Sequence, residues 1–245
     1  MKVTLDSNAW ERVFDPNDLS CLALREAFRS AAIRGFICDA AFRIEAITKT
    51  LRPEYFAQPY LDTQPKGPAL QNGRLLLFSL GPDDNRHPGL PEQQARKLTA
   101  ALASSVQIMR SLNWMGLPSP AQTLAPHDYV EESVSNRSAR ENRQIEVDAE
   151  IVARGFGRAA FEAADGWTAF AKADGNEKRL IKACAEWADG ELVAAHIAYG
   201  NDLICTNDRG IAAKRSILGA EGRAWLGSAY GVQFRTLSEL LAERA

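Results

Sequence analysis

Residues 188–210 read ADGELVAAHIAYGNDLICTNDRG, and this stretch decides the fold. An apolar helical pattern runs to Tyr199-Gly200. A short apolar strand from Leu203 to Cys205 follows and ends in Thr206-Asn207-Asp208. We expect Asp189-Gly190 to break or cap a helix, so that Asp189 lies in the first turn of the helix leading into this strand. A helix followed by a strand that ends in an acid is typical of an α/β fold.

The beginning and the end of the chain repeat this pattern. Lys2 to Leu5 reads as a strand that ends at Asp6, and Asp15-Pro16-Asn17-Asp18 has the chemistry of a helix start. A second apolar run, Phe36 to Cys38, precedes Asp39, which we interpret as the N-cap of a helix that contains Glu45. A last strand, Val232 to Phe234, leads into a helix from Leu237 to Ala242. We therefore predict a small parallel sheet.

The middle of the chain follows a different pattern. Seven of the eleven prolines lie between Pro53 and Pro91, where Arg74 to Leu80 is the one strand candidate. Helices are expected from Glu92 to Leu112 and from about Ser138 to Ala153. We predict that residues 1–54 and 172–245 form the core and that 55–171 is a mostly helical insertion. Its role stays open between a cap beside the site and a dimerisation element.

The overall charge excludes a strong electrostatic pull toward nucleic acid. There are 29 basic and 31 acidic residues, for a net charge of -2, so nucleic-acid binding requires a local basic patch. Arg137, Arg140 and Arg143 would share a helix face that could bind a phosphate backbone, but the nearby Glu141 and Glu146 favour a solvated surface. No apolar run approaches a membrane span, and the four scattered cysteines read as buried thiols. We expect a cytoplasmic protein that does not contact the membrane.

Four carboxylates are predicted to meet at one edge of the sheet: Asp6, Glu45, Asp189 and Asp208. Ligand sites of open parallel sheets form outside the carboxyl ends of the strands. Carboxylates that are close together repel one another unless a cation lies among them. Oxygen ligands without His or Cys suit Mg²⁺ or Mn²⁺, which activate water and hold phosphate oxygens. Each acid alone also fits a turn, an exposed helix position or a helix cap, so the hypothesis depends on their combination.

Four segments resemble the PIN-domain nuclease family: VTLDSNAW (3–10), FICDAAFRIEAI (36–47), the stretch 188–210 and GVQFRTLSELLAE (231–243). The resemblance implies a three-layer α/β/α PIN-like fold and a metal-dependent nuclease, with an endoribonuclease favoured. It assigns the four acids as catalytic ligands of Mg²⁺ or Mn²⁺. It also gives Asn8, Thr206, Asn207 and Arg209 supporting or substrate-contacting roles.

The same resemblance implies nucleic acid as the partner, with single-stranded or structured RNA favoured over DNA. Small toxins paired with an antitoxin are common in the family, but a large insertion such as 55–171 weakens that role here. A homodimer and an antitoxin-like partner both stay open. The cleavage sequence is not indicated.

Two other functions compete with the nuclease hypothesis. A haloacid-dehalogenase-like phosphatase also has an Asp after its first strand, but it needs a second Asp two positions later, where this chain has Asn8. A PIN fold retained as a non-catalytic scaffold would have no reason to keep mutually repelling acids. His196, two turns after Asp189, is interpreted either as a residue near the site or, preferably, as a packed core histidine.

Overall fold

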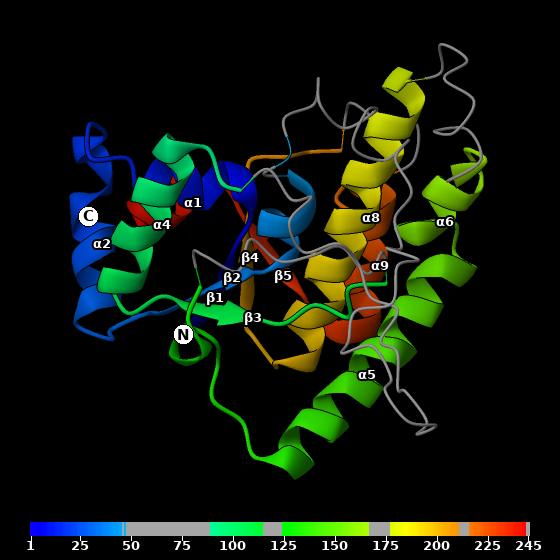
Figure 1. Cartoon of the computed structure of the whole chain (residues 1–245), viewed down its shortest axis with the longest axis horizontal. Coiled ribbons are helices and arrows are strands. Elements are labelled where there is room, and N and C mark those ends of the chain that lie inside the picture. The colour runs from blue at the N-terminus through cyan, green and yellow to red at the C-terminus, as the bar shows by residue number, and fades with distance from the viewer. Residues whose placement is uncertain (46, 48–88, 115–123, 167–176, 211–215, 244–245) are drawn as a thin grey trace, which may run out of the picture.

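The computed structural model describes residues 1–45, 47, 89–114, 124–166, 177–210 and 216–243 (Figure 1). Within these ranges the strands are β1 (Lys2–Leu5), β2 (Arg34–Cys38), β3 (Gln107–Met109), β4 (Leu203–Cys205) and β5 (Gln233–Arg235). They form one sheet in the order β3-β2-β1-β4-β5, and every neighbouring pair is parallel. The predicted α/β class and parallel sheet are confirmed.

The register of the strands aligns their carboxyl ends. Leu5, the last residue of β1, lies opposite Ile37 of β2 and Cys205 of β4. Because the three strands are parallel, the residues that follow them leave the sheet on the same side. We call this side the carboxyl edge.

Helices cover both faces of the sheet (Figure 1). Val3 and Leu5 pack in one core with residues of α1 (Ser7–Val13), α2 (Leu22–Arg29), α4 (Glu92–Ala103) and α10 (Leu237–Ala242). Phe36, Met109 and Ile204 face a second core formed with α5 (Val134–Ala153), α8 (Glu177–Ala198) and α9 (Ala220–Tyr230). Burial on both faces explains why the strands read as short continuous apolar runs.

Shorter helices complete the described chain, namely η1 (Leu19–Cys21), η2 (Ala41–Glu45, a π-helix), η3 (Pro126–Asp128) and α6 (Arg158–Glu162). Asp18 starts η1, because its side chain accepts a hydrogen bond from Ser20 N, and α2 follows directly. Thr236 and Glu239 form a capping box that starts α10. These two helix starts agree with the sequence prediction.

The predicted helix break at Asp189-Gly190 is wrong, because α8 is continuous from Glu177 to Ala198. Gly190 instead permits a close approach of two backbones. A Cβ added at Gly190 would lie 2.9 Å from the Cα of Gly157, which precedes α6. The glycine therefore serves packing between α6 and α8 rather than helix termination.

The predicted helix from Glu92 to Leu112 is also too long. Helix α4 ends at Ala103, Ser105 adopts a positive φ of 62°, and the chain then forms β3. Ile108 and Met109 are buried in opposite cores, which a helix at this place could not achieve. Strand β3, inside the range 55–171, thus belongs to the sheet, while Arg74 to Leu80 lies outside the described residues.

The predicted helix from Ser138 to Ala153 is confirmed as α5, which begins four residues earlier at Val134. Its N-cap is Ser133, whose side chain accepts a hydrogen bond from Asn136 N. Among the described helices, none combines the length and the apolar character that crossing a membrane requires.

Candidate functional site

The carboxyl edge gathers polar residues from neighbouring strands. Asp6 follows β1, Asp39 follows β2 and Thr206 follows β4, and the strand order places β1 between the other two. Ligands of open α/β sheets bind at such an edge. The carboxyl edge is therefore the candidate functional site.

Asp6 is the central acid of this edge. Its Oδ1 accepts a hydrogen bond from Ser7 N at 2.7 Å, and its Oδ2 accepts from Asn8 Nδ2 at 2.6 Å and from Thr206 Oγ1 at 2.5 Å. The residue is 4% exposed. Burial raises the pKa of Asp6 above its ordinary value and the charge of Asp208 raises it further, although the donors from Thr206, Ser7 and Asn8 oppose this.

Hydrogen bonds join the ends of β1 and β4. Asn8 Oδ1 accepts from Asn207 N at 2.8 Å, and Asn8 Nδ2 lies 3.3 Å from Thr206 Oγ1. Thr206 Oγ1 in turn accepts from Asp208 N at 3.0 Å. The structure thus brings Asp6, Asn8, Thr206, Asn207 and Asp208 together. Each belongs to the set predicted from the sequence.

Asp208 is exposed, and the loop around it is fixed by its neighbours. Its Oδ1 accepts from Gly210 N at 2.7 Å, and its backbone carbonyl accepts from Arg223 of α9. Gly210 has a φ of 65°, and a Cβ there would lie 2.6 Å from the backbone of Gly219. Arg223, which also donates to Leu218 O at 2.6 Å, is a positioning residue that the sequence pattern did not reveal.

Arg209, the predicted phosphate contact, is exposed beside Asp208. Its charge acts on Arg223, whose pKa is lowered first by burial and also by Arg209, while Asp208 opposes the shift. The Arg223 guanidinium therefore lies beside the loop of the exposed acid, and the charge of Arg209 is near enough to act on it.

The other two predicted acids are less fully defined. Glu45 is the last residue of η2, and its side chain lies outside the described residues. Asp189 is half-buried within α8, with electrostatic or hydrogen-bonding partners of its own. Within the described part of the chain, no three His, Cys, Asp or Glu residues lie close enough together to hold a metal ion. Assembly of all four acids stays a prediction.

A second group of polar residues, the buried polar cluster, lies where β2 and β3 end. It consists of Asp39, Arg43, Ser111 and Glu191. Asp39 Oδ1 accepts from Ser111 N at 2.7 Å, and Asp39 Oδ2 pairs with Arg43 Nη2 at 2.9 Å. The prediction that the Asp39 side chain caps the following helix is therefore wrong. Its backbone carbonyl instead accepts hydrogen bonds from Phe42 N and Arg43 N.

Glu191 of α8 completes the buried polar cluster. It is 3% exposed, and its Oε1 accepts from Trp114 N at 3.0 Å. Burial raises the pKa of Glu191 to about 7, and the charge of Asp39 also raises it, while a hydrogen bond with Ser111 opposes the shift. Near neutral pH this carboxyl group is therefore partly protonated.

Glu186, five residues earlier on α8, is a further buried acid. Its Oε1 accepts from Ile217 N at 2.7 Å and from Gly157 N at 3.3 Å. Burial raises the pKa of Glu186, and the charge of Asp208 contributes to the rise. Glu186 and Glu191 resemble ordinary helix acids in the sequence. Their one distinguishing feature is that most of their immediate neighbours, among them Trp187 and Leu192, are apolar.

His196 is a core residue, as preferred from the sequence. It is 1% exposed, and its Nδ1 lies 2.8 Å from Thr4 Oγ1. Burial lowers the pKa of His196 to about 4, so the ring is neutral at physiological pH. It packs against the face of the sheet and takes no part in the carboxyl edge.

The three arginines of α5 do not form a shared phosphate-binding face. Arg140 is buried, pairs with Glu132 at 3.0 Å and donates to Gln144 Oε1 at 2.5 Å. Arg143 is paired with Glu146, whereas Arg137 is exposed. The three arginines therefore form neither the shared phosphate-binding face nor a wholly solvated surface, because the central one, Arg140, is buried and stabilises the fold.

Asp6 and Asp208 are the described residues of the carboxyl edge that could hold a hard divalent cation. A buried carboxylate with a raised pKa lies near a second carboxylate, and no ion pair to Asp6 occurs within the described residues. Asp208 Oδ2 accepts no hydrogen bond from a described residue, so this exposed oxygen is open to a ligand. The candidate metal ligands are all carboxylate oxygens, which suit Mg²⁺ or Mn²⁺ better than Zn²⁺.

Comparisons of the chain with protein-family models, with curated proteins and with solved structures give no match. The case for a function therefore depends on the geometry of the carboxyl edge.

Proposed function

We propose that this protein is a metal-dependent nuclease with a PIN-like fold and that it hydrolyses phosphodiester bonds of RNA at the carboxyl edge. The observation that carries the proposal is the convergence of Asp6 and Asp208, from two neighbouring strands, around Thr206 and Asn8. Buried acids without a cationic partner are costly, and a divalent cation removes that cost.

Asp6 and Asp208 are the leading ligands of Mg²⁺ or Mn²⁺, and Glu45 and Asp189 complete the proposed set. When bound, such an ion lowers the pKa of a water molecule and neutralises charge on a phosphate. Thr206 and Asn8 hold the Asp6 carboxylate in one orientation through short hydrogen bonds. Arg223 holds the loop that presents Asp208, and exposed Arg209 is placed to contact a substrate phosphate.

The phosphatase alternative is disfavoured by the role of Asn8. That reaction needs a proton-transferring acid at this position, and an amide cannot supply one. Asn8 instead uses both ends of its amide, accepting from Asn207 N and donating to Asp6 Oδ2. This double engagement supports a structural task in the site.

Cleavage of an end-labelled single-stranded RNA in the presence of Mn²⁺ tests the proposal. Asp208→Asn and Asp6→Asn should lower the rate by about 100-fold or more, since each removes a ligand charge. Asp202→Asn is the matched control, because Asp202 lies just before β4, at the opposite end of the same strand, and hydrogen-bonds Lys2 N.

Full activity in both Asp6→Asn and Asp208→Asn would contradict the proposed site. A purified wild-type protein that cuts neither RNA nor DNA with Mn²⁺ or Mg²⁺ would contradict the nuclease itself and favour the non-catalytic scaffold.

A further inference from the structure

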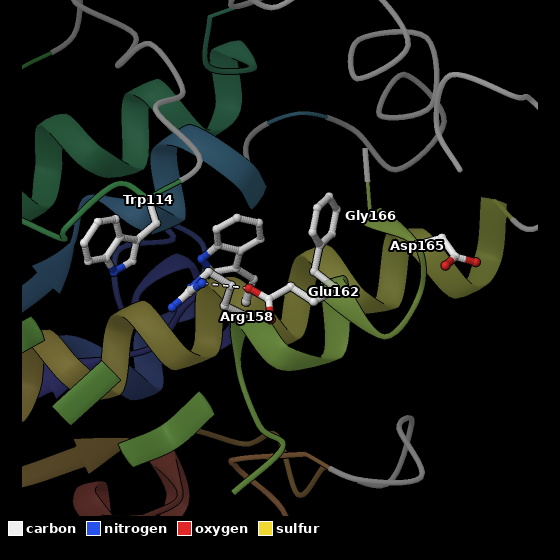
Figure 2. Close-up of a pocket in the computed structure, with 7 residues that line it drawn as sticks. Trp114, Arg158, Glu162, Asp165 and Gly166 are labelled. Atoms are coloured by element: carbon white, nitrogen blue, oxygen red, sulfur yellow. Dashed lines mark hydrogen bonds and ion pairs between the residues drawn. The ribbon is translucent and has the colours of Figure 1, made fainter. Parts of the chain in front are cut away.

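A cavity of about 480 Å³ lies beside α6 and α8 (Figure 2). Its walls include Trp114, Arg158, Phe161, Glu162, Asp165 and Trp187. The volume falls within the range of about 300 to 1,000 Å³ that is usual for small-molecule sites. Trp187 belongs to α8, whereas the other five residues belong to the range 55–171, which was predicted as an insertion.

Aromatic rings and a guanidinium group dominate one side of the cavity. Trp114 is 47% exposed, and the guanidinium of Arg158 lies 5.8 Å from its ring centre. The rings of Phe161 and Trp187 are in contact, with centroids 4.9 Å apart. An exposed indole beside a guanidinium group is a surface on which a planar ring stacks.

Two buried donors in the cavity wall lack acceptors. Trp187 is 4% exposed, and its Nε1 has no hydrogen-bond partner among the described residues. Arg158 Nε is likewise buried without an acceptor in the described chain. Both nitrogen atoms are buried, so they are not accessible to a ligand, and the polar groups that the cavity presents are the carboxylates of Glu162 and Asp165 and the guanidinium of Arg158.

The carboxylates at the cavity can accept hydrogen bonds from a ligand. Figure 2 shows Arg158 between Trp114 and Glu162, and Arg158 Nη1 donates to Glu162 Oε1 at 2.7 Å. Glu162 and Asp165 are both exposed at the cavity, and together they outweigh the single cation. This balance disfavours a phosphate and favours a neutral ring that donates hydrogen bonds.

Asp148 of α5 holds the stacking residues in place. It is buried, its Oδ2 accepts from Arg158 Nη2 at 3.3 Å, and its side chain hydrogen-bonds that of Trp114. A stacking surface braced in this way loses little entropy when a ring binds.

Helix α8 connects the cavity to the carboxyl edge. Trp187 follows Glu186, whose charge interacts with that of Asp208. Trp114 N donates to Glu191 of the buried polar cluster. The cavity and the carboxyl edge are therefore linked through residues of one helix.

We propose that this cavity binds one unstacked base of the nucleic acid, and that it prefers a base with an exocyclic amino group, such as cytosine. The ring stacks on Trp114, and the amino group donates to the carboxylate of Glu162. The link to cleavage rests on the proposed nuclease function, whereas base binding itself does not.

Fluorescence titration of metal-free protein with cytidine and with uridine tests the idea. Nucleosides carry no phosphate, so the carboxyl edge contributes nothing. Excitation at the red edge of the indole band reports on tryptophan, and each titration is corrected for absorption by the nucleoside with free tryptophan at the same nucleoside concentration. We expect cytidine to quench more strongly and at lower concentration than uridine.

Trp114→Ala should weaken cytidine binding by about tenfold or more, as expected for loss of one stacking contact. Trp225→Phe, which removes an indole on α9 away from the cavity, is the control and should bind normally. Glu162→Gln, an exposed and conservative change, should reduce the preference for cytidine over uridine even if Trp114→Ala proves unstable.

Failure of both nucleosides to bind at millimolar concentration, or equal binding that survives Trp114→Ala, would overturn the proposal. Cytidine binding that is lost in Trp114→Ala while the protein cuts no nucleic acid would support the base site and contradict only the proposed nuclease function.

Discussion

Thr206 Oγ1, at the end of β4, donates a hydrogen bond of 2.5 Å to Asp6 Oδ2, at the end of β1. Both side chains are buried, and 200 positions separate them in the sequence. The hydroxyl also accepts from Asp208 N and lies within hydrogen-bonding distance of Asn8 Nδ2. One hydroxyl thus couples the orientation of the buried acid to the position of the exposed one.

Replacing Thr206 with Val removes this hydroxyl at nearly constant volume. We expect a loss of about 1 to 3 kcal/mol in the free energy of unfolding, because buried Asp6 Oδ2 and Asp208 N lose a partner. The pKa of Asp6 should rise further, since the Thr206 hydrogen bond lowers it. Urea unfolding measures the loss, and Thr206→Ser, which keeps the hydroxyl, should retain most of the stability. Equal stability of Thr206→Val and the wild type would contradict this role.

Glu191 should make stability depend on pH. Its pKa is about 7 in the folded protein and 4.5 in the reference state, so the folded state binds the extra proton between these values. The contribution of Glu191 to the free energy of unfolding is therefore most favourable below pH 4.5. It falls between pH 4.5 and about 7, by about 3 kcal/mol in total, and is constant above that range.

Glu191→Gln should flatten that part of the stability curve. The comparison requires denaturant unfolding of both proteins at several pH values between about 5 and 7.5. An unchanged slope in the variant would show that another group causes the dependence.

Two helical glycines, Gly190 and Gly227, should respond in opposite ways to replacement by alanine, because only Gly190 is in close contact with another backbone. Gly190→Ala should destabilise by about 1 to 3 kcal/mol, because its Cβ would meet Gly157 Cα at 2.9 Å and outweigh the gain in helix propensity. Gly227→Ala in α9 should instead stabilise by about 0.5 to 1 kcal/mol, since its Cβ would meet only Val232 O at 3.7 Å. Thermal melts distinguish them, and stabilisation by Gly190→Ala would contradict the close approach.

Arg140 and Arg137 should differ sharply although both lie on α5. Arg140→Ala removes the partner of Glu132, an acid that is itself mostly buried, and should cost roughly 3 kcal/mol. Arg137→Ala removes an exposed charge and should change stability by less than about 0.5 kcal/mol. Similar unfolding midpoints for the two variants would contradict a structural role for Arg140.

Much of the fold follows from local patterns in the sequence. Strands β1 and β4 agree with the predicted bounds, because short apolar runs followed by Asp6 or by Thr206-Asn207-Asp208 leave little choice of register. The start of α10 was predictable because its cap is made by neighbouring residues, Thr236 and Glu239. Asp6, Asn8 and Asp208 were predicted to lie at one edge for the same reason, since each closely follows one of these two strands.

What could not be predicted depends on partners that are distant in the sequence. Gly190 suggested a helix break from the sequence, whereas in the structure it allows the close approach of the backbone at Gly157. Glu191 and Asp39 gain their burial from Trp114 and Ser111, which no local pattern associates with them. The stretch after Ala103 satisfied a helical period, but burial of Ile108 and Met109 in two different cores required a strand.

The central claim is that the carboxyl edge binds a divalent cation through Asp6 and Asp208, and Mn²⁺-dependent melting tests it most directly. Binding to the folded state raises the melting temperature in proportion to RT ln(1 + [L]/Kd), with Mn²⁺ more effective than Mg²⁺. Asp208→Asn is the informative variant, since Asp208 is exposed and its loss should not disturb folding. We predict a concentration-dependent rise for the wild type and for Asp202→Asn, and none for Asp208→Asn. A wild-type melting temperature indifferent to both ions, or an equal rise in Asp208→Asn, would contradict the claim.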